Sequence, residues 1–312
     1  MITANYSEGE INAAREAAAA RGEDLFLVPR SSPTVKRVGE LSTVAELYAL
    51  RVLNPKINKG KNTDRELARY VELDNKTNAA RKGLPASADF LSEELGRTLA
   101  ELSTKNVRIT SLIISGHDGG GKYGGTFGSI DFAAITKFAA SYPGFKTGLR
   151  SVYLLGCYTS TPFEVRNWKA GFENLKVVAG AEQKGLLRTD PRGWAWLSEA
   201  MLKEREFLKA TDARELNQVI ASTLKLNAFA SGIAVFADCA NGEKEFYRSQ
   251  STQNLFAQHS PNFCEKSVPA FLKNNSATLA FSDGRSPIPE NTAQSELREL
   301  YTFYRLHEQC NT

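Results

Sequence analysis

Apolar positions along this chain are arranged in short runs, separated by stretches in which apolar residues recur every three or four positions. The strongest runs, ITSLIIS at 109–115 and RSVYLLG at 150–156, are apolar almost throughout, which is typical of parallel strands covered on both faces. The intervening stretches have the spacing of amphipathic helices. Six runs predict strands, at 24–29, 69–73, 109–115, 150–156, 175–181 and 232–238. The run at 69–73 is the weakest of them.

Helix starts are indicated by capping residues. Ser7 and Glu10 have the spacing of a capping box, as do Thr43 and Glu46, and Asp190 precedes a proline at a third helix start. The predicted helices span 8–21, 44–53, 88–103, 130–142 after Ser129 as its cap, 190 to about 208, and 293–309, with a polar loop at 54–65. Two further helices are predicted to begin after Thr161 and Asp212 as their caps.

Strands that alternate with helices predict an α/β fold. We expect a mainly parallel sheet of about six strands, with right-handed crossovers and helices on both faces. The alternation ends near residue 238. The prediction is therefore one α/β domain at 1–238, which includes the N-terminal helix, and a loop-rich extension at 239–312 that packs on it and ends in a helix.

Composition removes several classes of function. The chain has 312 residues, 42% of them apolar and 24% charged, as in ordinary globular proteins, and its net charge of +4 is mild. Basic residues form no block and no stripe with aromatic residues, so no nucleic-acid partner is expected. No apolar run approaches the length of a membrane span, so no membrane partner is expected either.

The four cysteines and three histidines are too dispersed for a metal site. No two cysteines have the CxxC spacing and none clusters with histidines, so we predict no zinc and no cofactor. Cys239, Cys264 and Cys310 all fall in the C-terminal quarter, where sequence leaves a disulfide open. The first ten residues do not have the pattern of a signal peptide, and a mature exported chain would look the same. The compartment stays open, with a lean toward export.

Two reactive side chains follow predicted central strands. His117 comes two residues after the run at 109–115, within SGHDGGGKYGG, and Cys157 comes directly after the run at 150–156. Carboxyl ends of neighbouring parallel strands meet at one edge of a sheet, so we expect the imidazole and the thiol to face each other there. An imidazole that takes the thiol proton or stabilises the thiolate activates a cysteine nucleophile. Glycines beside His117 leave room for a substrate backbone and for N–H groups that face an oxyanion.

The same glycines fit two other motifs in part. The spacing at 119–124 matches GxGxxG of dinucleotide sites, but the glycines continue without opening a helix. The stretch 116–122 matches most of a P-loop, but Tyr123 replaces the hydroxyl residue that would hold magnesium. A third interpretation is structural, because a buried cysteine at a strand end is commonly inert and an isolated histidine is commonly incidental. The two strand-end motifs with one helix between them favour catalysis.

This pair of motifs resembles a known clan of enzymes. LIISGHDGGG at 112–121 and VYLLGCYTS at 152–160 are similar to the His and Cys motifs of caspase-like cysteine peptidases, which include caspases, separases, legumains, gingipains and clostripain. The order of the two residues and the interval between them match. VVAGAEQKGLLRTDPRGWAW at 177–196 resembles the strand after the cysteine in clostripain-like members, and the resemblance covers residues 24–238.

The resemblance implies a cysteine endopeptidase that acts on protein or peptide substrates. Cys157 would be the nucleophile and His117 the general acid/base. The oxyanion hole would consist of the backbone N–H groups of Cys157 and Asp118. Asp118 departs from the His-Gly pair of most members, which motivates an alternative, a catalytically silent caspase-like domain that binds peptides or protein partners. Another Cys-dependent hydrolase is a further alternative.

Substrate contacts are expected from the glycines beside the histidine, Gly116 and Gly119, and from Glu182 after the third central strand. By analogy with members that have acidic pockets, Glu182 predicts cleavage after Lys or Arg, and a solvated loop charge fits it equally well. Sequence does not determine the oligomeric state. Structural roles are expected for Asp190 (helix cap), Trp194 and Trp196 (core or pocket wall), and His259 and His307 (surface or packing).

Overall fold

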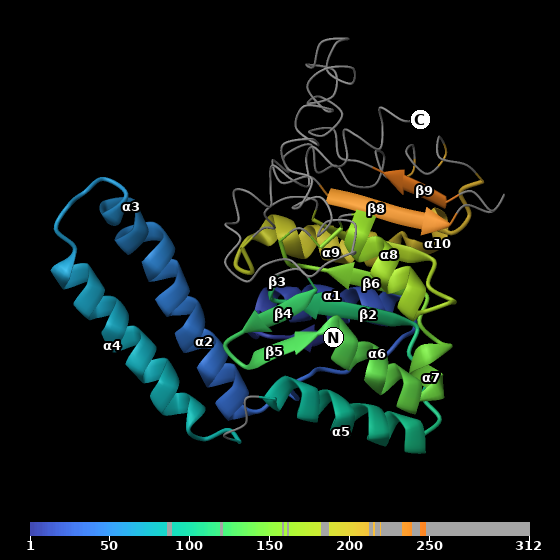
Figure 1. Cartoon of the computed structure of the whole chain (residues 1–312), viewed down its shortest axis with the longest axis horizontal. Helices are drawn as coiled ribbons and strands as arrows, with labels where there is room; N and C mark the ends of the chain where they lie inside the picture. The colour runs from blue at the N-terminus through green and yellow to red at the C-terminus, as the bar shows by residue number, and fades with distance from the viewer. Residues whose placement is uncertain are drawn as a thin grey trace, which may run out of the picture. The chain divides into compact units, whose positions relative to one another are not determined.

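The protein folds into two compact units of helices and strands, described here from a computed structural model (Figure 1). The first unit comprises Met1–Gly148 and Leu187–Leu202. The second comprises Leu149–Leu186 and the chain from Lys203 onward. The residues that the structure describes are 1–85, 89–118, 121–157, 159–160, 162–181, 187–211, 215, 219, 233–238 and 244–247.

Two parallel strands pair in the first unit. β1 (Ile2–Thr3) lies beside β2 (Ser111–Ser115), which confirms the strand predicted there. The strand predicted at 24–29 is reduced to a single bridge from β1 to Val28, because β1 itself spans only two residues. The apolar pattern missed β1, since two residues are too short to show a period.

Two helices of this unit, α1 (Glu8–Ala20) and α5 (Phe90–Thr104), follow the predictions closely. α1 packs against α9 (Pro191–Leu202). Ser7 caps α1 as expected, since its Oγ accepts a hydrogen bond from Glu10 N–H at 3.4 Å. The apolar stripe predicted for α5 is buried, at Leu91, Leu95, Leu99 and Leu102.

A helical hairpin projects from the rest of the first unit (Figure 1). One arm begins with α2 (Pro33–Tyr48) and continues through a π-helical turn, η1 (Ala49–Leu53), into α3 (Asn54–Ile57). The other arm is α4 (Asp64–Arg81), which packs along α2.

Three predictions for this hairpin were wrong. The helix predicted at 44–53 begins earlier, because Ser32 Oγ accepts a hydrogen bond from Val35 N–H at 3.1 Å and caps α2. The predicted cap, Thr43, lies inside α2, where its hydroxyl donates to Gly39 O at 2.8 Å. The segment predicted as a loop at 54–65 begins with the helix α3, and the segment predicted as a strand at 69–73 lies within α4.

Beyond β2, the glycine-rich segment forms a small antiparallel sheet. Its strands are β3 (His117–Asp118), β4 (Lys122–Gly125) and β5 (Gly128–Asp131). The helix predicted at 130–142 therefore starts late, and its cap is Asp131 rather than Ser129, because Asp131 Oδ1 accepts from Ala134 N–H at 2.7 Å. The helices that follow are α6 (Phe132–Ser141) and α7 (Pro143–Lys146).

The second unit contains two of the predicted strands in parallel. β6 (Ser151–Leu154) and β7 (Val177–Ala181) pair in parallel and are connected by α8 (Pro162–Gly171). β8 (Ile233–Asp238) is antiparallel to β7, and β9 (Lys244–Tyr247) is antiparallel to β8. The helix predicted from 190 to about 208 is divided into α9 and α10 (Glu204–Phe207).

The protein is therefore α/β: β1 pairs with β2 and β6 pairs with β7 in parallel, whereas β8 and β9 are antiparallel to their neighbours. β9 was not predicted. Apart from β9, the predicted extension at 239–312 and its helix at 293–309 lie outside the described residues, and both stay predictions. Within the described part of the chain, no helix has the length and apolar character needed to cross a membrane.

Candidate active site

His117 lies on the small antiparallel sheet that follows β2. It is the first residue of β3, and its partner across the strand pair is Gly124 of β4. The side chain of His117 is exposed, so a substrate would reach the imidazole from solvent. Asp118 follows in β3, opposite Tyr123. His117 lies just beyond a strand, as predicted, because only Gly116 separates it from β2.

The glycines of this segment allow close packing against the N-terminal residues. A Cβ atom at Gly116 would lie 2.9 Å from the Cβ of Ala4, and one at Gly125 would lie 2.3 Å from Asn5 Oδ1. Side chains at these positions would overlap their neighbours. Gly121 has a φ of 86°, a backbone conformation that L side chains rarely adopt. Gly116, Gly121 and Gly125 are therefore required by the packing and the backbone conformation of the segment itself.

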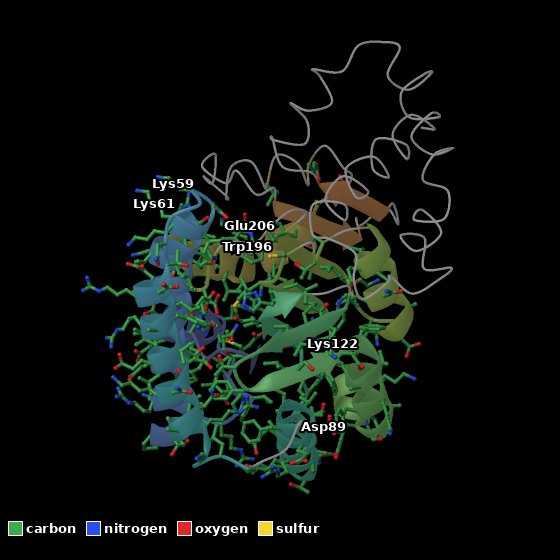
Figure 2. All side chains as sticks on the ribbon, turned by 60° about the vertical axis from the view of Figure 1, so that its left-hand side comes forward. Lys59, Lys61, Asp89, Lys122, Trp196 and Glu206 are labelled. Carbon is green, nitrogen blue, oxygen red and sulfur yellow. The ribbon has the colours of Figure 1, made fainter. Side chains whose placement is uncertain are left out.

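The described residues of the glycine segment form no phosphate-binding helix. Lys122–Gly125 is a strand, where a P-loop or a dinucleotide motif needs a helix to begin. Lys122 is exposed on β4 (Figure 2), and Tyr123 beside it is buried. The next helix, α6, has its first N–H groups beside the carboxylate of Asp131, which disfavours a phosphate there. The two nucleotide interpretations therefore lose their structural basis.

A buried hydrogen-bond network holds the end of β2. Ser115, the last residue of that strand, donates from Oγ to Glu10 Oε2 of α1 at 2.5 Å. Ser7 donates from Oγ to the carbonyl oxygen of Arg188 at 2.8 Å. The capping box predicted for α1 is therefore used differently at its two positions. Ser7 caps the helix, whereas the Glu10 carboxylate binds Ser115.

Arg188 extends this network to the turn between β4 and β5. Its guanidinium donates to Asn5 O at 2.7 Å and forms an ion pair with Glu46 of α2 at 2.7 Å. Asn5 Oδ1 accepts from the N–H of Thr126, in that turn, at 2.9 Å. Sequence reasoning missed the network, and its one signal was Ser115, a polar residue directly after the apolar stretch Leu112–Ile114. The network holds the glycine segment, and with it the backbone that carries His117.

Burial controls the ionisation of Glu10. The residue is 4% exposed, and desolvation raises the pKa of Glu10 to about 7. The hydrogen bond from Ser115 and the charge of Arg188 both act in the opposite direction and lower it in part. Near neutral pH this carboxyl group is therefore close to its midpoint, and the charge inside the network depends on pH.

Cys157 lies in the second unit, in the turn that follows β6. Its side chain is half-buried, and the turn begins directly after Leu154, the last residue of the strand. The hydroxyl of Thr159 lies 3.1 Å from Leu154 O and 3.2 Å from Gly156 O, and it accepts from Ala181 N–H at 3.2 Å. The thiol is therefore carried by a turn that is tied to both β6 and β7.

β7 has no room for a side chain where this turn packs. A Cβ atom at Gly180 would lie 2.5 Å from Thr159 Oγ1 and 2.7 Å from Ser160 Oγ. Ser160 also donates its backbone N–H to Ala181 O at 3.1 Å. The two hydroxyl residues of the cysteine motif are fully buried, so in this turn they have a structural role.

A second buried carboxylate anchors β6. Glu204 of α10 is 5% exposed and accepts hydrogen bonds from Ser151 Oγ at 2.7 Å and from Tyr153 OH at 2.8 Å. Sequence reasoning did not single out Glu204. The available signal was that Ser151 and Tyr153 share one face of an apolar strand and need a partner there.

Asp190 begins α9, as predicted. Its Oδ1 accepts from Arg192 N–H at 3.0 Å, and its carboxylate pairs with the Arg192 guanidinium at 2.6 Å. The hydrogen bond from the Arg192 side chain lowers the pKa of Asp190. Trp196 is a buried core residue of α9 (Figure 2). Trp194 is half-buried, and its Nε1 donates to Arg188 O at 2.8 Å.

The remaining site predictions keep their status as predictions. Gly119 and Glu182 lie outside the described residues. His117 belongs to the first unit and Cys157 to the second, and their pairing as a dyad stays a prediction, as does the oxyanion role of the Asp118 and Cys157 N–H groups. In the part of the chain that the structure describes, no three His, Cys, Asp or Glu side chains are grouped as metal ligands.

Comparisons of the chain with protein-family models, with curated proteins and with solved structures find no match. The caspase-like clan therefore stays a resemblance, carried by the motifs around His117 and Cys157.

Proposed function

We propose that this protein is a cysteine peptidase in which Cys157 is the nucleophile and His117 is the general acid/base. One observation carries the proposal: each residue lies just beyond a parallel strand, His117 after β2 and Cys157 after β6. Catalytic sites in parallel sheets form at the carboxyl ends of strands. The proposal includes a caspase-like sheet of about six strands, covered by helices on both faces, in which these two strands are neighbours.

The chemistry follows from the two side chains. His117 takes the proton of the Cys157 thiol, and the thiolate attacks the carbonyl carbon of the scissile peptide bond. A C–S bond forms, and the carbonyl oxygen becomes an oxyanion that the N–H groups of Asp118 and Cys157 stabilise. His117 then gives its proton to the leaving amine as the C–N bond breaks. Water hydrolyses the thioester, which releases the acid and restores the thiol.

The proposed substrates are proteins or peptides with Lys or Arg before the cleaved bond. Glu182 is next in the chain after Ala181, the last residue of β7, and β7 runs parallel to β6. A carboxylate at that end of the sheet attracts a basic side chain close to a nucleophile at Cys157.

Affinity labelling tests the nucleophile directly. A peptidyl acyloxymethyl ketone with Arg at its terminal position should alkylate Cys157, as identified by mass spectrometry of the digested protein. The other three cysteines of the chain, Cys239, Cys264 and Cys310, serve as internal controls and should remain unmodified. Cys157→Ala should abolish labelling.

Kinetics with fluorogenic Lys and Arg peptides test the two roles. Cys157→Ala should lower kcat/KM by more than about 1,000-fold. His117→Ala should lower it by about 10²- to 10⁴-fold, the usual contribution of general acid/base catalysis. His259→Ala is the matched control and should change it less than about twofold.

The outcomes separate the proposal from its alternative. Wild-type turnover that survives in Cys157→Ala contradicts the peptidase proposal. Binding of the same peptides with no turnover by either protein would instead support the catalytically silent, peptide-binding domain.

A further inference from the structure

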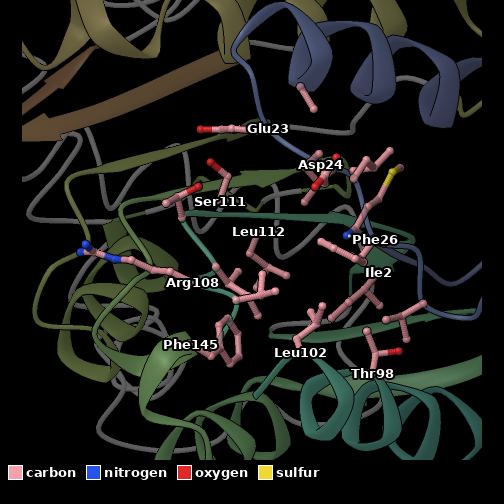
Figure 3. A pocket seen from close by; sticks show the side chains of 18 of the residues that line it. Ile2, Glu23, Asp24, Phe26, Thr98, Leu102, Arg108, Ser111, Leu112 and Phe145 are labelled. Atoms are coloured by element: carbon pink, nitrogen blue, oxygen red, sulfur yellow. Dashed lines mark hydrogen bonds between the residues drawn. The ribbon is translucent and has the colours of Figure 1, made fainter. Parts of the chain in front are cut away.

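The first unit contains a cavity that the proposed function does not use. Its volume is about 320 Å³, and it lies between α5, the chain before β2 and the segment at 22–28 (Figure 3). His117 follows the carboxyl end of β2, whereas the cavity is lined by residues 107–113, at the amino end of that strand. The apolar side chains of its wall include Leu95, Leu99, Leu102, Leu112 and Phe145.

One wall residue has a polar group without a partner. Thr98 of α5 is 6% exposed, and its Oγ1 is buried with no hydrogen bond to any described residue. Other helical threonines satisfy their hydroxyls within the helix, since Thr77 donates to Leu73 O at 3.1 Å. A buried hydroxyl without a partner costs about 1–3 kcal/mol. Thr98 therefore points to a ligand that supplies the missing partner.

The lining of the cavity also includes an exposed ring and charged side chains of both signs. Phe26 is 39% exposed. Asp24 and Arg108, both exposed, contribute one charge of each sign, and Glu23 is already paired with Arg21 at 2.9 Å. Met1 also lines the cavity, and burial lowers the pKa of its amino group to about 5, so the lining has no net charge near neutral pH and favours a neutral ligand over an anion or a cation.

The volume limits the size of that ligand. A cavity of about 150 Å³ holds a benzene molecule. A cavity of about 320 Å³ is roughly twice as large and admits about ten non-hydrogen atoms. Pockets of this kind are mostly apolar, with a small number of polar groups that orient the ligand.

We propose that this cavity binds a neutral, mostly apolar small molecule of bicyclic-ring size, with one hydroxyl or carbonyl group that hydrogen-bonds Thr98 Oγ1. The apolar wall provides the affinity by removing the ligand from water. The hydroxyl of Thr98 selects molecules with a polar group at one position, because an apolar analogue leaves it without a partner.

Two probes of the same shape test the proposal, 2-naphthol and 2-methylnaphthalene. Each is titrated into the full chain with ¹³C-labelled leucine methyl groups, and NMR spectra report the signals of Leu95, Leu99 and Leu102. Both probes should shift these signals in a saturable way. The methyl probe lacks the polar group, so the ratio of the two affinities measures the hydrogen bond.

Thr98→Val retains the shape of the side chain and removes its hydroxyl. The affinity ratio of 2-naphthol to 2-methylnaphthalene should fall about 5- to 10-fold in Thr98→Val, the value of one hydrogen bond. Thr98→Ser, which keeps the hydroxyl, and Thr77→Val, which removes one elsewhere, should leave the ratio unchanged. No saturable shift with either probe would overturn the proposal, and so would an affinity ratio that Thr98→Val leaves unchanged.

Discussion

The buried carboxyl group of Glu10 makes the stability of the first unit depend on pH. Its pKa rises from an ordinary value of 4.5 to about 7 in the folded protein, chiefly because of desolvation. The folded state therefore prefers the protonated form. Between these two pH values unfolding releases a proton, so this stabilisation is complete below pH 4.5 and is lost as pH rises through about 7. At about 1.4 kcal/mol per pH unit, the full loss is about 3 kcal/mol.

Glu10→Gln isolates this effect, because an amide fills the same space and does not titrate. We expect the free energy of unfolding of Glu10→Gln, relative to wild type, to increase by about 2–3 kcal/mol from pH 5 to pH 8. Urea unfolding followed by tryptophan fluorescence measures the difference. Glu8→Gln removes an exposed carboxylate from the same helical turn and controls for the loss of one charge. A pH-dependent change below about 1 kcal/mol would refute the reasoning.

Three further predictions concern packing and hydrogen bonds. Gly125→Ala should lower the free energy of unfolding by about 2–3 kcal/mol in a urea titration, because its Cβ would lie 2.3 Å from Asn5 Oδ1. The control Gly124→Ala, whose Cβ would have its nearest contact at 3.5 Å, should lower it by less than about 1 kcal/mol. Thr98→Val should be neutral or stabilising in thermal unfolding, because it removes a hydroxyl without a partner, whereas Thr77→Val should lower Tm. Glu204→Leu should destabilise the protein by about 2–4 kcal/mol by calorimetry, because it removes the acceptor of the buried hydrogen bonds from the Ser151 and Tyr153 hydroxyls. A cost below about 1 kcal/mol would contradict this assignment.

Local sequence patterns predicted the elements whose environment repeats along the chain. The apolar runs that became β2, β6 and β7 are buried on both faces, and the leucine stripe of α5 has a clear helical period. The cap at Ser7 depends only on residues within one turn. The positions of His117 and Cys157 just beyond strands followed from the same runs.

The pattern failed where a partner distant in sequence decided the structure. The segment at 69–73 is helical because α4 packs along α2 and buries Leu73. β8 has the same apolar character as β7, and only its pairing makes it antiparallel. Apolar character reports burial, and it does not report strand direction.

The glycine segment shows the division most clearly. Sequence alone indicated that it carries a histidine and does not open a helix, and favoured a role for its glycines in admitting a substrate backbone over a phosphate site. Tertiary structure decided that Gly116 and Gly125 fit against Ala4 and Asn5. It also decided that Glu10 meets Ser115, although 105 positions separate them in the chain. Such contacts leave no periodic pattern in the sequence. A carboxylate in the first turn of a helix has the sequence pattern of a capping residue, and only the fold removes it from water and provides its partner.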